Sequence, residues 1–345
     1  MPYVGRMIAS LLVLISCANY ALGQAPPPQP APVQPGQPVA NQLAPGAPGL
    51  PAYAPFQLTP QEQQFLDQLL KIWETESAKI QIFRSEFTLF EYDTNSAPVD
   101  PVPAPAVANP LPVSLMRLCY GEVRYSKPDK GYYEVTKVNN VIPDAAQGRA
   151  LQLSTEPGEK WICDGTAIYE FNRPTKKVVE RRLPPHLLGK AIVDGPLPFV
   201  FGIEAAKLKD RYWLRVITPP NDQAHTWIEA FPKRQSDAAN YQRIEIVLRN
   251  QDLMPIALQV FLPNHSLHKK VSNVYTFKEP SANGLADKIA NFWGAFVRPA
   301  LPLGWTWYVD DPQVAQGQPG QPQPAQAPQQ PPPTGVLPFR LIPRR

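Results

Sequence analysis

The stretch "EKWICDGTAIYEFN" (159–172) decides the expected fold, because it places an Asp-Gly pair between two short apolar runs. Asp-Gly accepts the positive φ angles of a type I′ turn, so the stretch predicts a β-hairpin with a two-residue loop. In that register Trp161 lies opposite Ile168, and Ile162 lies opposite Ala167. Alternation along the strands then makes both faces apolar: Trp161, Cys163 and Ile168 share one face, and Ile162, Ala167, Tyr169 and Phe171 share the other.

Short runs of the same kind continue on both sides of this hairpin. Turn signals such as Pro-Asp-Lys-Gly (128–131) separate them, and this spacing predicts an antiparallel meander. The expected strands cover residues 82–93, 117–129, 131–138, 159–163, 167–172, 176–183, 212–217, 225–232, 241–250, 255–263 and 270–277.

A helix is predicted over residues 60–79, ahead of the strands. Thr59 is its N-cap, Pro60 takes the first helical position and Glu62 completes a capping box. Residues with helical spacing predict one buried stripe, made of Phe65, Leu66, Leu69, Leu70 and Trp73.

Two further short helices are expected between residues 184 and 211, around an apolar link. A connected sheet of this many strands tends to curl, and its inner face then needs a cover. We therefore predict an α+β fold, in which a strongly curved antiparallel sheet (a half-barrel) carries an N-terminal helix and two short lid helices. The aromatic stretch 289–310 is expected to pack back on this body.

The N-terminal residues 1–23 have the features of an export signal: Arg6, an apolar run over 7–16 and small residues before Gln24. "LISC" (14–17) offers an alternative, because it has the form of a lipobox in which Cys17 would be lipidated. Both alternatives place the domain in the periplasm or the cell envelope.

Two segments rich in Pro, Gln and Ala, 24–57 and 312–345, are predicted to be disordered arms. Between them we expect one domain over residues 58–311, interrupted by a Pro-rich insertion at 96–113. The formal net charge of +4 is too small to favour a nucleic-acid partner.

Catalytic and metal-binding motifs are missing from the sequence. His265 and His268 stand beside Lys269 and Lys270, which repel cations, so no metal site is expected there. Three carboxylates alternate with apolar residues, as solvent-facing positions do: Glu159, Glu170 and Glu180. The sequence therefore predicts a protein that is not an enzyme and uses no cofactor.

Cys119 and Cys163 both follow the export signal, and an oxidising compartment permits a disulfide. No hairpin register makes the two neighbours. We expect two buried thiols that act as small apolar residues.

Several phrases, taken in order, resemble the periplasmic lipoprotein-carrier family (LolA/LolB-like), and more closely a domain of unassigned role that recurs in secreted planctomycete proteins. The likeness covers about residues 60–280. It rests on "SEFT" (85–88), "GEVRYSKPDKGYYEV" (121–135), "KWICDGTAIYEFN" (160–172), "LPFVFG" (197–202), residues 228–261 and "VYTF" (274–277). The resemblance implies a half-open barrel with helices across its mouth, around an apolar cavity that takes up acyl chains.

The carriers place an arginine before the proline of the turn after their second strand, where it bonds to the lid. The matching residue here is Lys127, before Pro128. Lysine lacks the planar guanidinium group of arginine, so a weaker hold on the lid is expected.

The sequence thus predicts an exported, non-enzymatic module that binds an acyl chain or a lipoprotein. The expected cavity residues, or their neighbours in the opposite register, are Phe87, Leu89, Val123, Tyr125, Ile168, Ile246, Leu248, Leu258 and Val260, with Phe199, Phe201 and Leu69 on the lid side. The alternative is an envelope scaffold with a filled interior, whose Pro-rich arms bind partner proteins.

Overall fold

The computed structural model describes residues 54–95, 111–144, 148–156, 158–185, 188–189, 204–284 and 294–310. Several predicted parts lie outside the described residues: the export signal with Cys17, residues 24–53 of the first arm, the whole second arm, residues 96–110 of the insertion, and Phe199 and Phe201. The domain boundaries therefore stay predictions.

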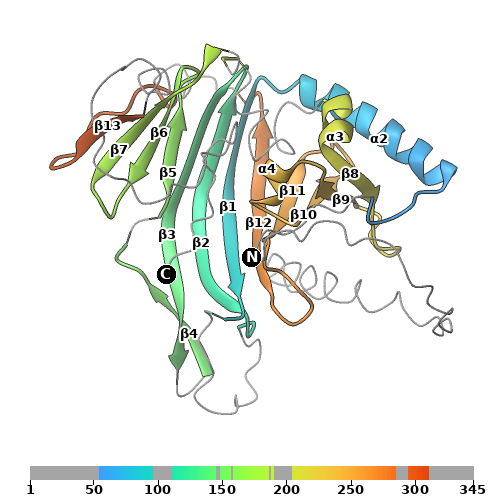
Figure 1. The fold of residues 1–345 in the computed structure, drawn as a ribbon, viewed down its shortest axis with the longest axis horizontal. Coiled ribbons are helices and arrows are strands. Elements are labelled where there is room, and N and C mark those ends of the chain that lie inside the picture. The colour runs from blue at the N-terminus through green and yellow to red at the C-terminus, as the bar shows by residue number, and fades with distance from the viewer. Residues whose placement is uncertain are drawn as a thin grey trace, which may run out of the picture.

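The described residues form three helices and one sheet of thirteen strands (Figure 1). The helices are α2 (Pro60–Ala78), α3 (Ala205–Arg211) and α4 (Gln235–Ala238). The strands are β1 (Ile82–Asp93), β2 (Leu115–Ser126), β3 (Lys130–Asp144), β4 (Gly148–Leu153), β5 (Lys160–Cys163), β6 (Ala167–Asn172), β7 (Lys177–Arg182), β8 (Tyr212–Val216), β9 (His225–Pro232), β10 (Arg243–Arg249), β11 (Pro255–Phe261), β12 (Val271–Ala282) and β13 (Thr306–Asp310).

The strand order is β13-β7-β6-β5-β3-β2-β1-β12-β11-β10-β9-β8. The remaining strand, β4, pairs with β3. Neighbouring strands are antiparallel except β13 and β7, which are parallel. The two end strands, β13 and β8, do not pair with each other, so the curved sheet is open within the part of the chain described (Figure 1). This confirms the predicted antiparallel, unclosed sheet. Of the two expected lid helices, only α3 falls among the described residues.

Helix α2 begins with the predicted capping box. The Thr59 main-chain N–H donates to the Glu62 carboxylate at 2.7 Å, and the Glu62 N–H donates to Thr59 Oγ1 at 3.3 Å. Its buried stripe differs from the prediction at one position, because Phe65 is 53% exposed. The helix lies against β8 (Figure 1) and buries Leu66, Leu69, Leu70, Trp73 and Ser77.

The hairpin of β5 and β6 exists, but its predicted register is wrong by two residues. Trp161 lies opposite Glu170 and Cys163 opposite Ile168, so Gly165 and Thr166 form the loop. Gly165 has a φ of +94° and Thr166 has no positive φ, which is typical of a type II′ turn with Gly at its first central position. A shift of two residues keeps every side chain on its predicted face.

The hairpin of β5 and β6 is covered on one of its faces by the segment 294–310. We call the face on which α2 lies the inner face and the opposite one the outer face. On the outer face, the segment 294–310 covers the hairpin, as expected from its aromatic sequence: the Tyr169 and Trp307 rings lie 6.0 Å apart, and those of Phe171 and Trp305 lie 5.9 Å apart.

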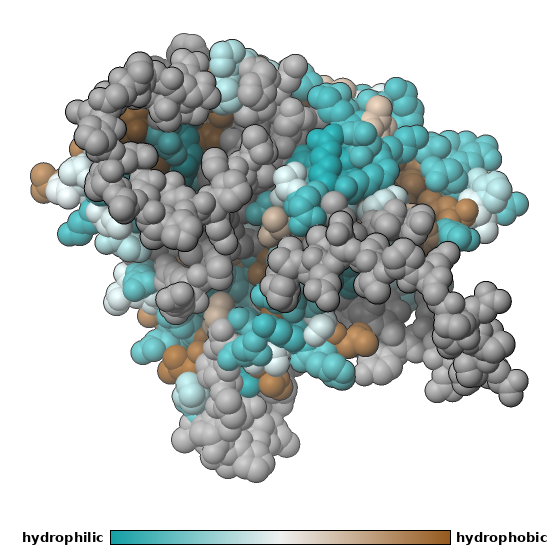
Figure 2. Space-filling model, viewed as in Figure 1, coloured by the Kyte–Doolittle hydropathy of each residue, from teal (hydrophilic) through white to brown (hydrophobic). Residues whose placement is uncertain are grey.

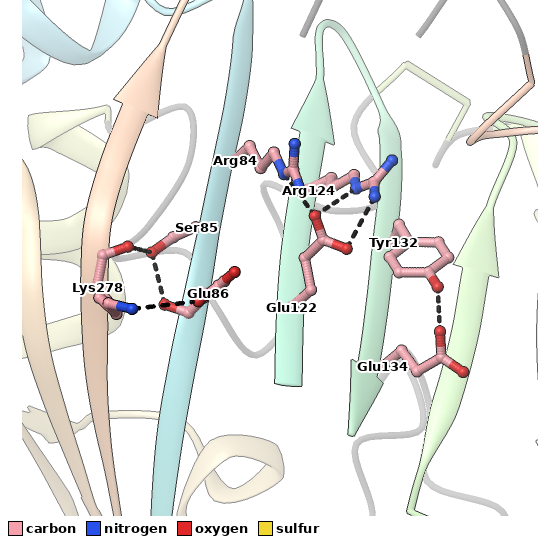
Figure 3. Close-up of polar contacts among 8 residues, drawn as sticks. All are labelled: Arg84, Ser85, Glu86, Glu122, Arg124, Tyr132, Glu134 and Lys278. Carbon is pink, nitrogen blue, oxygen red and sulfur yellow. Dashed lines mark hydrogen bonds and ion pairs between the residues drawn. The ribbon is translucent and has the colours of Figure 1, made fainter. Parts of the chain in front are cut away.

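The outer face of the central strands is charged instead (Figure 3). Arg84 and Arg124 lie directly opposite each other on β1 and β2. Glu122 neutralises this like-charged pair, because its carboxylate accepts from Arg84 Nε at 2.5 Å and from Arg124 Nε at 2.8 Å. Tyr132 and Glu134 extend the polar network to β3. The outer face of the central strands is therefore mixed: this charged network lies on one part of it, and a small apolar cluster with Tyr92, Leu115, Val141 and Val274 lies on another.

Candidate functional site

The inner face carries two apolar clusters. The first, which we call the inner cluster, consists of Ile80, Phe83, Phe87, Leu89, Cys119, Val123, Tyr125, Tyr133, Val135, Val138, Trp161, Cys163, Ile168 and Leu183. Within the part of the chain described, no helix contributes a member to it. Its buried surface is thus made by one face of β1, β2, β3, β5 and β6 and by residues next to these strands.

The second, the helix-covered cluster, joins β8–β11 to α2 and α3. It consists of Leu66, Leu69, Leu70, Trp73, Leu208, Tyr212, Leu214, Ile228, Ala230, Tyr241, Ile244, Ile246, Leu248, Leu253 and Leu258. Tyr275 and Phe277 of β12 pack against both clusters, so the apolar inner face is continuous across the sheet.

The predicted cavity residues divide between these clusters. Five of them belong to the inner cluster: Phe87, Leu89, Val123, Tyr125 and Ile168. Ile246, Leu248 and Leu258 belong to the helix-covered cluster, against which Val260 packs. Leu69 lies in that second cluster as well, so it contacts the β8–β11 half rather than the central strands. All of these residues face inward, but α2 fills only one half.

Aromatic rings line the middle of the inner cluster. The Phe87 and Tyr133 rings are stacked 5.1 Å apart, and those of Tyr133 and Trp161 are stacked 5.8 Å apart. Gly121, opposite Phe87 on β2, leaves the space for this arrangement, because a Cβ there would lie 2.4 Å from Phe87 Cζ. The sequence did not single out Tyr133, and only its alternation with Tyr132 placed it on the inner face.

Carboxylates border the inner cluster. Val135 N–H donates to Glu159 O at 2.8 Å, which places Glu159 beside Val135 on the inner face. Loss of surrounding water, with Glu170 and Glu91 nearby, raises the pKa of Glu159 to about 7. Glu159 is exposed at the surface, as the sequence predicted.

The other predicted solvent-facing carboxylates are partly or wholly buried. Glu170 is half-buried and accepts from Arg181 Nε at 3.2 Å. Glu180 is 7% exposed and binds Arg298 at 2.9 Å, so the prediction for Glu180 was wrong. Arg298 also lies over the Trp307 ring, and the segment 294–310 is what covers Glu180.

Lys127 does bond to a helix. Its Nζ donates to the main-chain oxygen of Ala78 at 2.7 Å, and its N–H donates to Gln81 O at 2.8 Å. Asn283 Nδ2 adds a bond to Lys79 O at 2.9 Å. Helix α2 has no basic residue in its last turn, so Lys127 supplies the cation that favours a helix C-terminus.

Both thiols are buried and unpaired with each other, as predicted. Cys119 and Cys163 lie in the inner cluster, on strands that β3 separates. Burial raises the pKa of each thiol to about 12, which keeps them protonated and unreactive.

No three His, Cys, Asp or Glu side chains gather as metal ligands among residues the structure describes. None of the described helices has the length and apolar character needed to span a membrane.

Comparisons with known proteins find likeness only among solved structures, since no family model and no curated protein matches. An uncharacterized conserved protein from Thermus thermophilus is 8% identical, with a TM-score of 0.35 over 70% of this chain and 98% of that one. A LolA superfamily protein from Nitrosomonas europaea is 11% identical, with a TM-score of 0.28 over 68% and 97%. The MucA/MucB complex from Pseudomonas aeruginosa is 12% identical, with a TM-score of 0.27 over 64% and 58%.

These likenesses, all at TM-scores below 0.5, do not assign the chain to a family, so its resemblance to the lipoprotein carriers stays a prediction. The planctomycete likeness stays a prediction. At these TM-scores no functional argument follows, and function has to be inferred from the contacts of this chain.

Proposed function

We propose that this protein is a non-enzymatic, exported module that holds an acyl chain of a lipid or lipoprotein against the inner cluster. One observation carries the proposal: the central strands present a continuous apolar inner face, at most 9% exposed, to which no described helix contributes a side chain, whereas α2 fills the neighbouring half. Cavity residues from the central strands, above all Phe87, Val123 and Ile168, would contact the chain.

The hydrophobic effect is sufficient for such binding. Each methylene that leaves water contributes about 0.8 kcal/mol, so a sixteen-carbon chain gains roughly 10 kcal/mol before ordering costs. Polar chemistry is not required, which agrees with a face whose charges are confined to its border.

Uptake of a fluorescent fatty acid by delipidated protein tests the proposal. A matched pair of variants locates the site: Met254 packs, half-buried, against the inner cluster, while Ile256 packs, half-buried, against Trp227, Val247 and Ala257. We expect saturable binding that Met254→Glu weakens about tenfold or more and Ile256→Glu leaves unchanged. Wild-type protein that takes up no ligand, and purifies without lipid in native mass spectrometry, overturns the proposal.

An envelope scaffold is the second candidate, and one observation favours it. Ile246, Leu248 and Leu258 are at most 2% exposed and packed with α2. Phe87 and Val123 of the inner cluster are also only 2% exposed, so the burial on both halves of the inner face fits a filled interior. Deleting residues 24–57 and 312–345 separates the two functions, because a lipid-binding module keeps its ligand and a scaffold loses its partner proteins in a pull-down.

A further inference from the structure

The sheet ends at β13, whose outer edge has no strand beside it among the described residues. The opposite end strand, β8, is in contact with α2 and α3. β13 (TWYVD) contains no Pro, Gly or Lys, and its pairing with β7 is regular over all five residues. Its one charge, Asp310, is bound by Arg181 at 2.5 Å. Thus β13 lacks the proline, lysine and bulges that commonly keep an edge strand from pairing.

Exposed apolar side chains are frequent on β13 and in the segment before it. Five of the thirteen large hydrophobic residues that are exposed in the described structure lie within 294–310: Val297, Leu301, Leu303, Tyr308 and Val309. Figure 2 shows hydrophobic surface at the tip of the segment that leads into β13, at the left edge of the view. On β13 itself, Tyr308 is 54% exposed and Val309 is 43% exposed. Such a concentration marks an interaction surface.

The pairing with β7 fixes which backbone N–H and C=O groups of β13 point toward β7 and which point away from it. Thr306 N–H donates to Lys176 O at 3.0 Å, as the parallel pairing of Thr306 with Lys177 requires. The N–H and C=O groups of one residue point to the same side of a strand, and successive residues alternate. Thr306, Tyr308 and Asp310 therefore face β7, while the backbone groups of Trp307 and Val309 face outward.

We infer that β13 pairs antiparallel with β13 of a second copy of this chain, about a two-fold axis at Tyr308. In that register Trp307 lies opposite Val309 of the partner subunit, and these are the residues whose backbone groups face outward, so each pair exchanges two hydrogen bonds. Thr306 lies opposite Asp310 of the partner subunit, and Tyr308 lies opposite Tyr308 of the partner subunit.

The strand is self-complementary in this register. No like charges face each other, and aromatic and β-branched side chains meet across the pair. A two-fold interface of this kind is closed, so it produces a dimer rather than a fibre. The inference does not depend on lipid binding, because the inner cluster contributes no residue of β13.

Analytical ultracentrifugation of the purified protein tests the dimer. We expect the wild type to dimerise with rising concentration. Tyr308→Asp and Tyr308→Lys each place like charges across the axis and should raise the dissociation constant about 100-fold. An equimolar mixture of the two variants should restore the dimer, because it brings opposite charges together. Val309→Pro, which removes an outward N–H without touching the pairing to β7, should also weaken it.

Leu267→Asp is the control, because Leu267 is 86% exposed and lies outside the β13 segment; it should dimerise like the wild type. Near-ultraviolet circular dichroism verifies that each variant is folded. A wild-type protein that stays monomeric at all concentrations overturns the inference, as does a Tyr308→Asp variant that dimerises normally. A mixture that stays monomeric rules out the register about Tyr308.

Discussion

Lys127 and Ala78 are joined by a hydrogen bond of 2.7 Å, from the lysine Nζ to the main-chain oxygen near the end of α2. The bond ties the turn between β2 and β3 to the helix that fills half of the inner face. It stands where the resemblance to lipoprotein carriers implies a contact with a lid, but its partner is α2. The described part of the 184–211 segment bonds to the same turn at another residue, because Gly189 N–H donates to Asp129 Oδ2 at 2.7 Å.

Replacing Lys127 tests the strength of this bond. Lys127→Met removes both the donor and the cation at the helix C-terminus, and should lower the free energy of unfolding by about 0.5–1 kcal/mol. Lys127→Arg keeps both and should stay within experimental error of the wild type. Urea denaturation measures the difference, and equal stabilities of the Met and Arg variants would show that the bond contributes nothing.

The loop of the hairpin makes a second prediction. A Cβ on Gly165 would lie 2.7 Å from Asp129 Oδ1, at a φ of +94°. Gly165→Ala should therefore cost about 2–3 kcal/mol, from backbone strain and a steric clash together. Gly304→Ala is the matched control: Gly304 has a φ of +77° and no neighbour within 4 Å, so only strain, about 1 kcal/mol, is expected. Thermal unfolding compares the two, and similar losses would contradict the described loop.

A buried carboxyl on β10 predicts a pH dependence. Burial raises the pKa of Glu245 from 4.5 to about 7, although Arg243 lies 3.3 Å away. Over this range the folded state holds a proton that the unfolded state releases, so stability falls as the pH rises from about 4.5 to 7. Glu245→Gln should reduce this slope and be more stable than the wild type at pH 8, on the order of 1 kcal/mol. Chemical denaturation at pH 5 and pH 8 measures it, and Glu86→Gln, at a largely exposed position, should keep the wild-type slope. An unchanged slope in Glu245→Gln would refute the assignment.

Two carboxylates, Glu229 and Glu122, each bind two arginines but differ in exposure, so they test how burial changes the stability that an ion pair contributes. Glu229, with a side chain 2% exposed, accepts from Arg215 at 2.5 Å and Arg243 at 2.8 Å. Glu122 joins Arg84 and Arg124 in the same way, but is 17% exposed. Glu229→Gln removes a nearly fully buried counter-charge from Arg215 and Arg243, whose side chains are 35% and 18% exposed, and should cost about 2–3 kcal/mol. Glu122→Gln should cost about 1 kcal/mol, and equal losses in urea denaturation would falsify the argument from burial.

Local interactions explain which parts of the fold were predictable. The capping box of α2 involves residues three positions apart, and an Asp-Gly pair specifies a turn within four residues. The face of each hairpin side chain was predictable as well, because a shift of two residues preserves alternation. The predicted register was wrong although its cause is local as well: Asp164 accepts hydrogen bonds from Thr166 N–H and Ala167 N–H, and this Asx-type turn moves the loop to Gly165 and Thr166.

The candidate site also has features that were predictable from the sequence and features that were not. Alternation offered Phe87, Val123 and Ile168, or their neighbours in the opposite register, as inner-face residues, and the structure has these three in the inner cluster. The exposure of Phe65 and the burial of Glu180 were not predictable, because the first depends on how α2 is oriented over the sheet and the second on Arg298, far along the chain.

The sequence by itself thus determined the elements and their apolar faces, because caps, turns and strand alternation act over a few residues. Only the tertiary structure decided that α2 packs on the β8–β11 half of the inner face and contributes no side chain to the inner cluster on the central strands. It also decided that 294–310 covers the outer side of the hairpin and ends the sheet at β13. The pairing of β13 with β7 joins residues that are far apart in the sequence, such as Arg181 and Asp310, 129 positions apart. A local sequence pattern cannot predict such a contact, because its free energy depends on the rest of the sheet being assembled.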